Sequence, residues 1–189
     1  MHNMKKGIFA LSIMLLGASA LMGQKYFTKD GKVSFYSDAP MEKIEAHNTK
    51  AASVIDASSG QMEFAVLIKA FQFEKALMQE HFNENYMESS TYPKASFKGK
   101  LEDPGNVKMN QDGTYQTNVS GELTIHGVTK NVTTPATFTV KDGQVVGKAT
   151  FTILIEDYGV KIPAVVKDKI AREVKIDIES QYLPMDDKS

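Results

Sequence analysis

Hydrophobic and polar residues alternate with a period of two along most of the chain after residue 24. The alternation is clearest over residues 145–156, where one side consists of Val145, Gly147, Ala149, Phe151, Ile153 and Ile155. The opposite side is mostly polar and includes Lys148, Thr150, Thr152 and Glu156. A helix would bring together residues three and four apart, and this pattern does not fit that spacing. The segment therefore predicts a β-strand with one buried face and one solvated face.

The same alternation recurs in further segments of the chain. We expect strands in residues 32–35, 62–69, 96–101, 115–125, 131–140 and 173–182, and a short strand that starts at Ile44. Hairpin turns are indicated by glycines after a polar residue, at Asp30-Gly31, Asp112-Gly113, His126-Gly127 and Asp142-Gly143. Short turns make neighbouring strands antiparallel.

About eight strands of this length favour a closed barrel, since closure removes the exposed strand edges that invite aggregation. An eight-stranded barrel is also wide enough to hold one small ligand or to be filled by its own side chains. The predicted fold class is all-β with minor helices: an antiparallel eight-stranded β-barrel capped by helices.

Two segments predict helices. Residues 74–90 carry an apolar stripe of Leu77, Met78, Phe82 and Tyr86, and residues 163–170 begin with a proline, which the first turn of a helix tolerates. The longer helix has two interpretations. It is a lid whose Met78, Phe82, Tyr86 and Met87 touch a ligand, or an amphipathic helix that seals the barrel, which is the commoner use of such a stripe.

The first 23 residues have the pattern of a secretion signal. Lys5 and Lys6 precede an uncharged apolar run over residues 7–16, and Ala18-Ser19-Ala20 supplies small residues for cleavage after Ala20 or Gly23. A membrane anchor is the less favoured interpretation, because the run is short for a membrane span. We therefore predict a signal peptide at 1–23, a single domain at 24–189 and, for a Gram-negative source, a periplasmic location. Nothing after residue 23 predicts an integral membrane segment.

The composition of the chain excludes several kinds of chemical site. The chain has no cysteine, which excludes disulfides, thiolate nucleophiles and thiolate metal ligands. Its net charge is −1, with the basic residues spread among acids, so we expect no nucleic-acid partner. The histidines lack metal-site spacing. We expect no metal, no cofactor and no catalytic residue. Lys161 with Arg172 is a candidate contact for an anionic headgroup, against the commoner role of solvated charges.

Several motifs resemble the YceI-like family of lipid- or polyisoprenoid-binding proteins. The longest is GELTIHGVTK at residues 121–130; LMQEHFN at 77–83, YPKASF at 92–97 and EDYGV at 156–160 are shorter. The resemblance covers nearly all of the chain after the predicted leader. It implies a lipocalin-like barrel whose pore holds a long isoprenoid or fatty chain.

Periodicity alone leaves a solid core and a cavity about equally favoured, and the resemblance favours a cavity. The candidate ligand-binding residues are the apolar side chains on the inward faces of the strands and on the long helix: Phe64, Val66, Ile68, Met78, Phe82, Phe97, Val119, Leu123, Phe138, Phe151, Ile153 and Ile178.

The predicted function is a periplasmic carrier of an apolar chain, such as a polyisoprenoid, a quinone-like molecule or a fatty acyl group. One alternative is an enzyme acting on a small apolar substrate, which needs polar groups converging deep in the barrel, such as His126 with an acid. The other is a ligand-free envelope adaptor with a solid interior. The expected partner is an isoprenoid or other lipid-like ligand, and a homodimer is compatible with the sequence.

Overall fold

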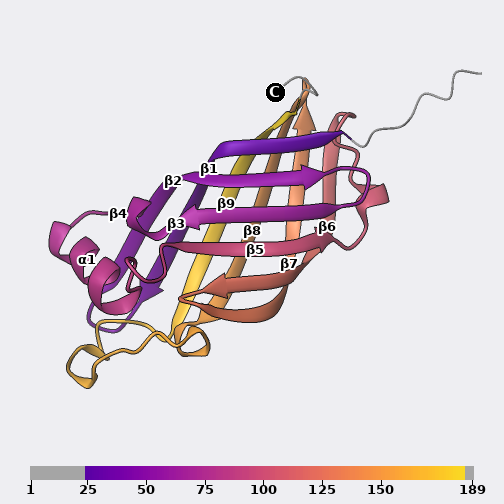
Figure 1. Cartoon of the computed structure of the whole chain (residues 1–189). Coiled ribbons are helices and arrows are strands. Elements are labelled where there is room, and N and C mark those ends of the chain that lie inside the picture. The colour runs from indigo at the N-terminus through magenta and orange to yellow at the C-terminus, as the bar shows by residue number, and fades with distance from the viewer. Residues whose placement is uncertain (1–23, 186–189) are drawn as a thin grey trace, which may run out of the picture.

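Eight antiparallel strands close into a barrel in the computed structural model, which describes residues 24–185 (Figure 1). The predicted signal peptide lies outside these residues. The strands are β1 (Lys25–Asp38), β2 (Lys43–Asp56), β3 (Gln61–Leu67), β5 (Lys94–Leu101), β6 (Gly113–Ile125), β7 (Val128–Lys141), β8 (Gln144–Leu154) and β9 (Glu173–Pro184). Their order is β1-β9-β8-β7-β6-β5-β3-β2, and pairing of β1 with β2 closes the ring. The predicted fold class is confirmed.

Two of the predicted hairpin turns have the backbone that a two-residue loop requires. His126 and Gly127 have φ of 50° and 75°, and Asp142 and Gly143 have φ of 50° and 77°. Positive φ at both central residues matches the right-handed twist of the flanking strands. These turns join β6 to β7 and β7 to β8, so that Ile125 pairs with Val128 and Lys141 with Gln144.

The other two predicted turns are not hairpins. Gly31 lies inside β1, where the register with β2 shifts, so the segment is a bulge in one long strand. A Cβ at Gly31 would lie 2.8 Å from Ser180 Oγ and 3.1 Å from Ala51 O, which explains glycine at this close approach. Gly113 begins β6 after a longer connection over residues 102–112, which contains the short helix η3 (Pro104–Asn106).

Several predicted boundaries were also wrong. The strand predicted to be short from Ile44 is β2, which has 14 residues. Strand β8 ends at Leu154, because residues Ile155–Tyr158 form the 3-10 turn η4. Strand β3 ends at Leu67, and Ile68 begins the 3-10 turn η1 (Ile68–Ala70), which leads to the two-residue strand β4 (Gln72–Phe73).

Both predicted helices are shorter than expected. The first comprises α1 (Ala76–His81) and the π-helical turn η2 (Phe82–Tyr86). Lys75 is extended, with ψ of 123°, and Glu88 has φ of 42°; neither conformation continues a helix. The second predicted helix is reduced to the 3-10 turn η5 (Ala164–Val166). None of the helices within residues 24–185 has the length and hydropathy needed to cross a bilayer.

One end of the barrel is filled by side chains, and we call it the floor. Val107 and Met109, from the connection before β6, are buried there together with Leu101, Phe138 and Tyr182. We call the opposite end the mouth. There, α1 and the segment after β8 lie beside the barrel opening (Figure 1). The connection before β6 therefore plugs the floor, while helical segments and loops border the mouth.

Candidate functional site

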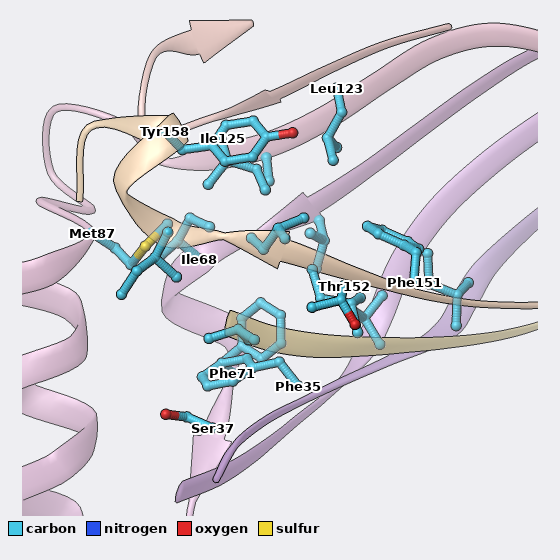
Figure 2. A pocket seen from close by; sticks show the side chains of 18 of the residues that line it. Phe35, Ser37, Ile68, Phe71, Met87, Leu123, Ile125, Phe151, Thr152 and Tyr158 are labelled. Carbon is cyan, nitrogen blue, oxygen red and sulfur yellow. The ribbon is translucent and has the colours of Figure 1, made fainter. Parts of the chain in front are cut away.

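Between the floor and the mouth, the barrel contains a cavity of about 700 Å³. Inward-facing Ile176 and Ile178 are only half-buried, although β9 is paired around them with β8 and with β1. Phe151 and Ile153 of β8 are half-buried as well, but beyond Ala149 strand β8 is paired with β9 alone. Such residues would be fully buried if side chains from the opposite wall filled the centre. Figure 2 shows Phe35, Phe71, Leu123 and Phe151 facing the same hollow. The inward-facing side chains of the alternating pattern therefore line a space and do not fill it.

The wall of this cavity contains every candidate ligand-binding residue named from the sequence. They are Phe64, Val66, Ile68, Met78, Phe82, Phe97, Val119, Leu123, Phe138, Phe151, Ile153 and Ile178. Val119 and Phe138 also belong to the buried cluster of the floor, so they form the base of the cavity. Contact between these side chains and a ligand stays a prediction.

Sequence reasoning missed part of the wall at the mouth. Phe35, Phe71 and Phe73 surround Phe82, with ring centroids 5.3, 5.8 and 5.0 Å from that of Phe82. The Phe35 ring is stacked on Phe82 and the other two are edge-on or tilted, and rings in such arrangements attract one another beyond their burial. The alternation of Phe71 and Phe73 around Gln72 was the available indication, but the segment is too short to stand out.

The predicted helix both covers part of the mouth and lines the cavity. Met78, Phe82, Tyr86 and Met87 all lie on the cavity wall, and Phe82 also packs against the aromatic rings of β1 and β4. We call residues 76–88 the lid; its inner surface belongs to the cavity wall. Contact between the lid and a ligand stays a prediction.

The floor carries two linked hydrogen bonds that involve side chains. The Tyr182 hydroxyl donates to Ser53 Oγ at 3.1 Å, and Ser53 Oγ donates to the Glu63 carbonyl at 2.8 Å. Burial raises the pKa of Tyr182 to about 12, against a smaller lowering by its hydrogen bonds. The phenol thus stays neutral at the base of a mostly apolar cavity.

Charged groups lie at the rim. Lys75 Nζ is 3.3 Å from Glu42 Oε1, which ties the start of α1 to the turn between β1 and β2. Arg172, one of the two candidate headgroup contacts, pairs with Glu156, and this hydrogen bond raises the pKa of its guanidinium. Arg172 is therefore already engaged, and a headgroup contact by Lys161 stays a prediction.

His126 has an acidic partner, but the pair does not line the cavity. Its Nε2 lies 2.8 Å from Glu88 Oε2, its Nδ1 lies 3.3 Å from the Tyr158 carbonyl, and its ring stands edge-on to Tyr92. These contacts fasten the β6–β7 turn to the lid and to η4. His81, at the end of α1, lines the cavity at the exposed mouth. Within residues 24–185, no group of three His, Asp or Glu side chains is arranged to hold a metal ion.

A comparison with known protein families matches residues 24–182 to the YceI-like domain. The chain belongs to this family. The resemblance noted in the motifs is thereby confirmed, and it extends over the whole barrel. Comparison with curated proteins gave no significant match.

Solved structures share the fold of this YceI-like domain at low sequence identity. A polyisoprenoid-binding domain from Saccharophagus degradans, implicated in plant cell wall breakdown, superposes with a TM-score of 0.75 at 13% identity, covering 85% of this chain and 98% of that one. Burkholderia cenocepacia BcnA gives a TM-score of 0.66 at 20% identity, covering 80% and 95%. The Campylobacter jejuni YCEI protein gives 0.55 at 16% identity, covering 98% and 94%.

Proposed function

We propose that this YceI-like domain is a binding protein that carries an apolar chain in its barrel, either a polyisoprenoid, a quinone-like molecule or a fatty acyl group. The observation that carries the proposal is the ring of half-buried apolar side chains around a cavity of about 700 Å³. This volume lies within the usual range of ligand pockets. The polyisoprenoid-binding domain from Saccharophagus degradans, which shares the fold, supports the choice of ligand class.

The energetics favour a chain over a small polar molecule. Burial of each methylene group contributes about 0.8 kcal/mol, so ten of them contribute roughly 8 kcal/mol before the losses of motional freedom on binding. An apolar wall needs no polar contacts to obtain this gain. Between Tyr182 at the base and the charged groups at the rim the wall is mostly apolar, with the hydroxyl groups of Ser96, Thr133, Thr134 and Thr152 among its lining residues.

We propose binding without catalysis as the role of this site. The enzyme hypothesis needs polar groups that converge in the barrel, such as His126 with an acid. His126 and its partner Glu88 lie at the flank of the mouth and not on the cavity wall. The cavity also weighs against an adaptor with a solid interior. Secretion to the periplasm after removal of residues 1–23 completes the proposal and is supported by the leader pattern.

Uptake of a fluorescent polyene fatty acid by protein stripped of lipid tests this function. We expect saturable binding to the native sequence and at least tenfold weaker binding to Ala149→Phe, whose ring would project into the cavity from β8. Thr139→Phe is the matched control, because Thr139 lies on the exposed face of β7 and does not line the cavity. Equal uptake by both variants would contradict the proposal.

A further inference from the structure

The hydrogen-bonded wall of the barrel is interrupted between β7 and β8. The pairing of these strands ends at Ala136 with Ala149, although β7 begins at residue 128 and β8 continues to residue 154. Over the remaining lengths β7 pairs with β6 alone and β8 with β9 alone, and within residues 24–185 no other strand pairs with the two free edges. We call the opening between residues 128–135 and 150–154 the β7–β8 gap.

A proline explains where the pairing stops. The pair of residues that flanks a two-residue hairpin loop exchanges two backbone hydrogen bonds, and so does every second pair after it. Counted from the β7–β8 hairpin, Pro135 with Thr150 would be such a pair. Proline has no N–H to donate, so it ends the exchange. The Thr134 hydroxyl donates to the Thr150 carbonyl instead, at 3.4 Å.

The end of the gap nearer the mouth is held by contacts between the β6–β7 turn and η4. His126 Nδ1 lies 3.3 Å from the Tyr158 carbonyl oxygen, and a Cβ at Gly159 would lie 3.6 Å from Val128 Cγ2. The Thr134 hydroxyl holds the other end. The gap is therefore a window in the wall with both ends fastened.

Polar groups from both sides of the gap border the cavity. Thr133 of β7 and Thr152 of β8 line the cavity, and they would be opposite each other if the register of the two strands continued. Figure 2 shows Thr152 next to Phe151 among the lining side chains. By the alternation of hydrogen bonds along a strand, both threonines direct their backbone N–H and C=O groups toward the opposite edge of the gap. The gap thus brings hydroxyl groups and backbone donors and acceptors to a mostly apolar wall.

Charges around the gap are mostly paired with one another. Lys148 lies 2.9 Å from Glu179, and Asp177 accepts a hydrogen bond from Thr150 at 2.8 Å and lies 3.0 Å from Lys175. Two further charged residues beside the gap, Lys130 and Asp157, are exposed and do not line the cavity. Glu42, Lys75, His81 and Lys169 line the cavity but lie outside β7 and β8. The groups that the gap presents to a ligand are therefore uncharged.

A pure hydrocarbon does not match these groups. A chain that lies against the gap displaces water from it, and a backbone donor or acceptor that loses water without gaining another partner destabilises the complex. A hydroxyl or carbonyl group at this point replaces the lost water. A carboxylate or phosphate would instead lose its own water without meeting a free positive charge.

We infer that the β7–β8 gap is a binding subsite for an uncharged hydroxyl or carbonyl group carried by the chain in the cavity. Thr133, Thr152 and the free backbone edges beside them donate to this group and accept from it. The subsite favours a long alcohol or a quinone-like ligand over a chain with an anionic head. This inference rests on the proposed function, because the subsite acts only on a ligand that occupies the cavity.

Photolabelling locates the polar group of a bound chain. The probe is hexadecan-1-ol with a diazirine next to its hydroxyl group, and the matched probe is the same hydrocarbon chain with the diazirine but without the hydroxyl. We expect residues 129–135 and 150–154 to take a share of the label at least about fivefold larger from the alcohol than from the hydrocarbon. Equal shares, or alcohol label concentrated in the lid or at the floor, would overturn the inference.

Removal of the two hydroxyl groups gives a second test. Thr133→Val with Thr152→Val keeps the β-branched shape of both side chains. We expect the affinity for the alcohol to fall about tenfold and the affinity for the hydrocarbon to fall by less than about twofold. Thr139→Val, on the exposed face of β7 where it pairs with β8, is the control and should change neither affinity. Equal losses for both probes in the double variant would contradict a polar subsite.

The subsite and the carrier function fail in different ways. Saturable binding of both probes with the same label pattern would remove the subsite and leave the carrier function. Absence of saturable binding by either probe and by the fluorescent fatty acid would remove the carrier function, and the subsite with it. Free strand edges also pair with other chains. Alcohol label at residues 129–135 that is present in the monomer and lost in a purified dimer would assign these edges to a second copy of the chain and overturn the inference.

Discussion

The imidazole of His126 lies with its Nε2 2.8 Å from the carboxylate of Glu88, although the two residues are 38 positions apart in the chain. Glu88 follows cavity-lining Met87 in the lid, and His126 follows cavity-lining Ile125 at the end of β6. The pair therefore fastens the lid to the barrel just outside the cavity. Both residues adopt positive φ, 42° for Glu88 and 50° for His126, which turns the chain sharply at each side of the contact.

Replacement of His126 tests this fastening. His126→Asn keeps a residue that tolerates positive φ but loses the contacts with Glu88, Tyr158 and Tyr92. We expect the free energy of unfolding to fall by about 1–2 kcal/mol, as measured by urea denaturation. His47→Asn is the control. Its ring bonds Ser34 and Glu45 on an exposed surface, so its loss should cost less than about 0.5 kcal/mol. Equal losses would show that the lid is not held by His126.

The aromatic cluster should hold the lid from the inside. Phe82→Ala removes the ring that contacts Phe35, Phe71 and Phe73, and we expect the free energy of unfolding to fall by roughly 2–3 kcal/mol. Hydrogen exchange should also become faster in α1 and leave β6 and β7 unchanged. Leu77→Ala, at an exposed position of the same helix, should cost less than about 1 kcal/mol. Uniformly faster exchange would contradict a local role.

Burial of Tyr182 predicts a loss of stability at high pH. An unfolded tyrosine ionises near pH 10, whereas burial holds the pKa of Tyr182 at about 12 in the folded protein. Between these values the folded state binds more protons than the unfolded state, so stability is fully present below about pH 10 and falls as pH rises to about 12. The loss is about 1.4 kcal/mol per pH unit over this window. Urea denaturation at pH 9 to 12 should show a shallower decline in Tyr182→Phe than in the native sequence; parallel declines would refute the assignment.

The two hairpin glycines offer a matched pair of substitutions. Gly127 and Gly143 have nearly the same φ, 75° and 77°, but a Cβ at Gly127 would lie 2.5 Å from Tyr92, while one at Gly143 meets nothing within 4 Å. Gly143→Ala should therefore cost about 1 kcal/mol from backbone strain alone. Gly127→Ala should cost roughly 1–3 kcal/mol more, because it also displaces the ring that packs on His126. Thermal denaturation measures both, and equal costs would contradict the packing at Tyr92.

The sequence predicted the barrel best where apolar and polar residues alternate strongly. Strands β6, β7 and β8 carry Leu123, Phe138 and Phe151 on the inward face, so their period of two is visible. Strand β2 was underestimated because its buried positions are small or polar, as at Ala46, Asn48, Ala51 and Ser53. The bulge at Gly31 has the sequence of a turn, and only pairing with β2 and β9 shows that β1 continues.

The alternation of apolar and polar residues could not predict the cavity itself. Alternation predicts which side chains of β8 point inward, but whether they meet across the barrel depends on its diameter and on the segments that plug the floor. Val107 and Met109, which close the floor, lie in a connection with no strand pattern. Phe35 of β1, Phe73 of β4 and Phe71 just before β4 reach Phe82 in the lid only after the chain has folded.

Native mass spectrometry of the protein purified from its own host tests the central claim most directly, because it weighs whatever the barrel holds. The account predicts a bound species that organic solvent extracts, that is reduced in Ala149→Phe and that is retained in Thr139→Phe. Protein that carries no added mass, and that gains none after incubation with polyprenols, quinones and fatty acids, would contradict a cavity built for an apolar chain.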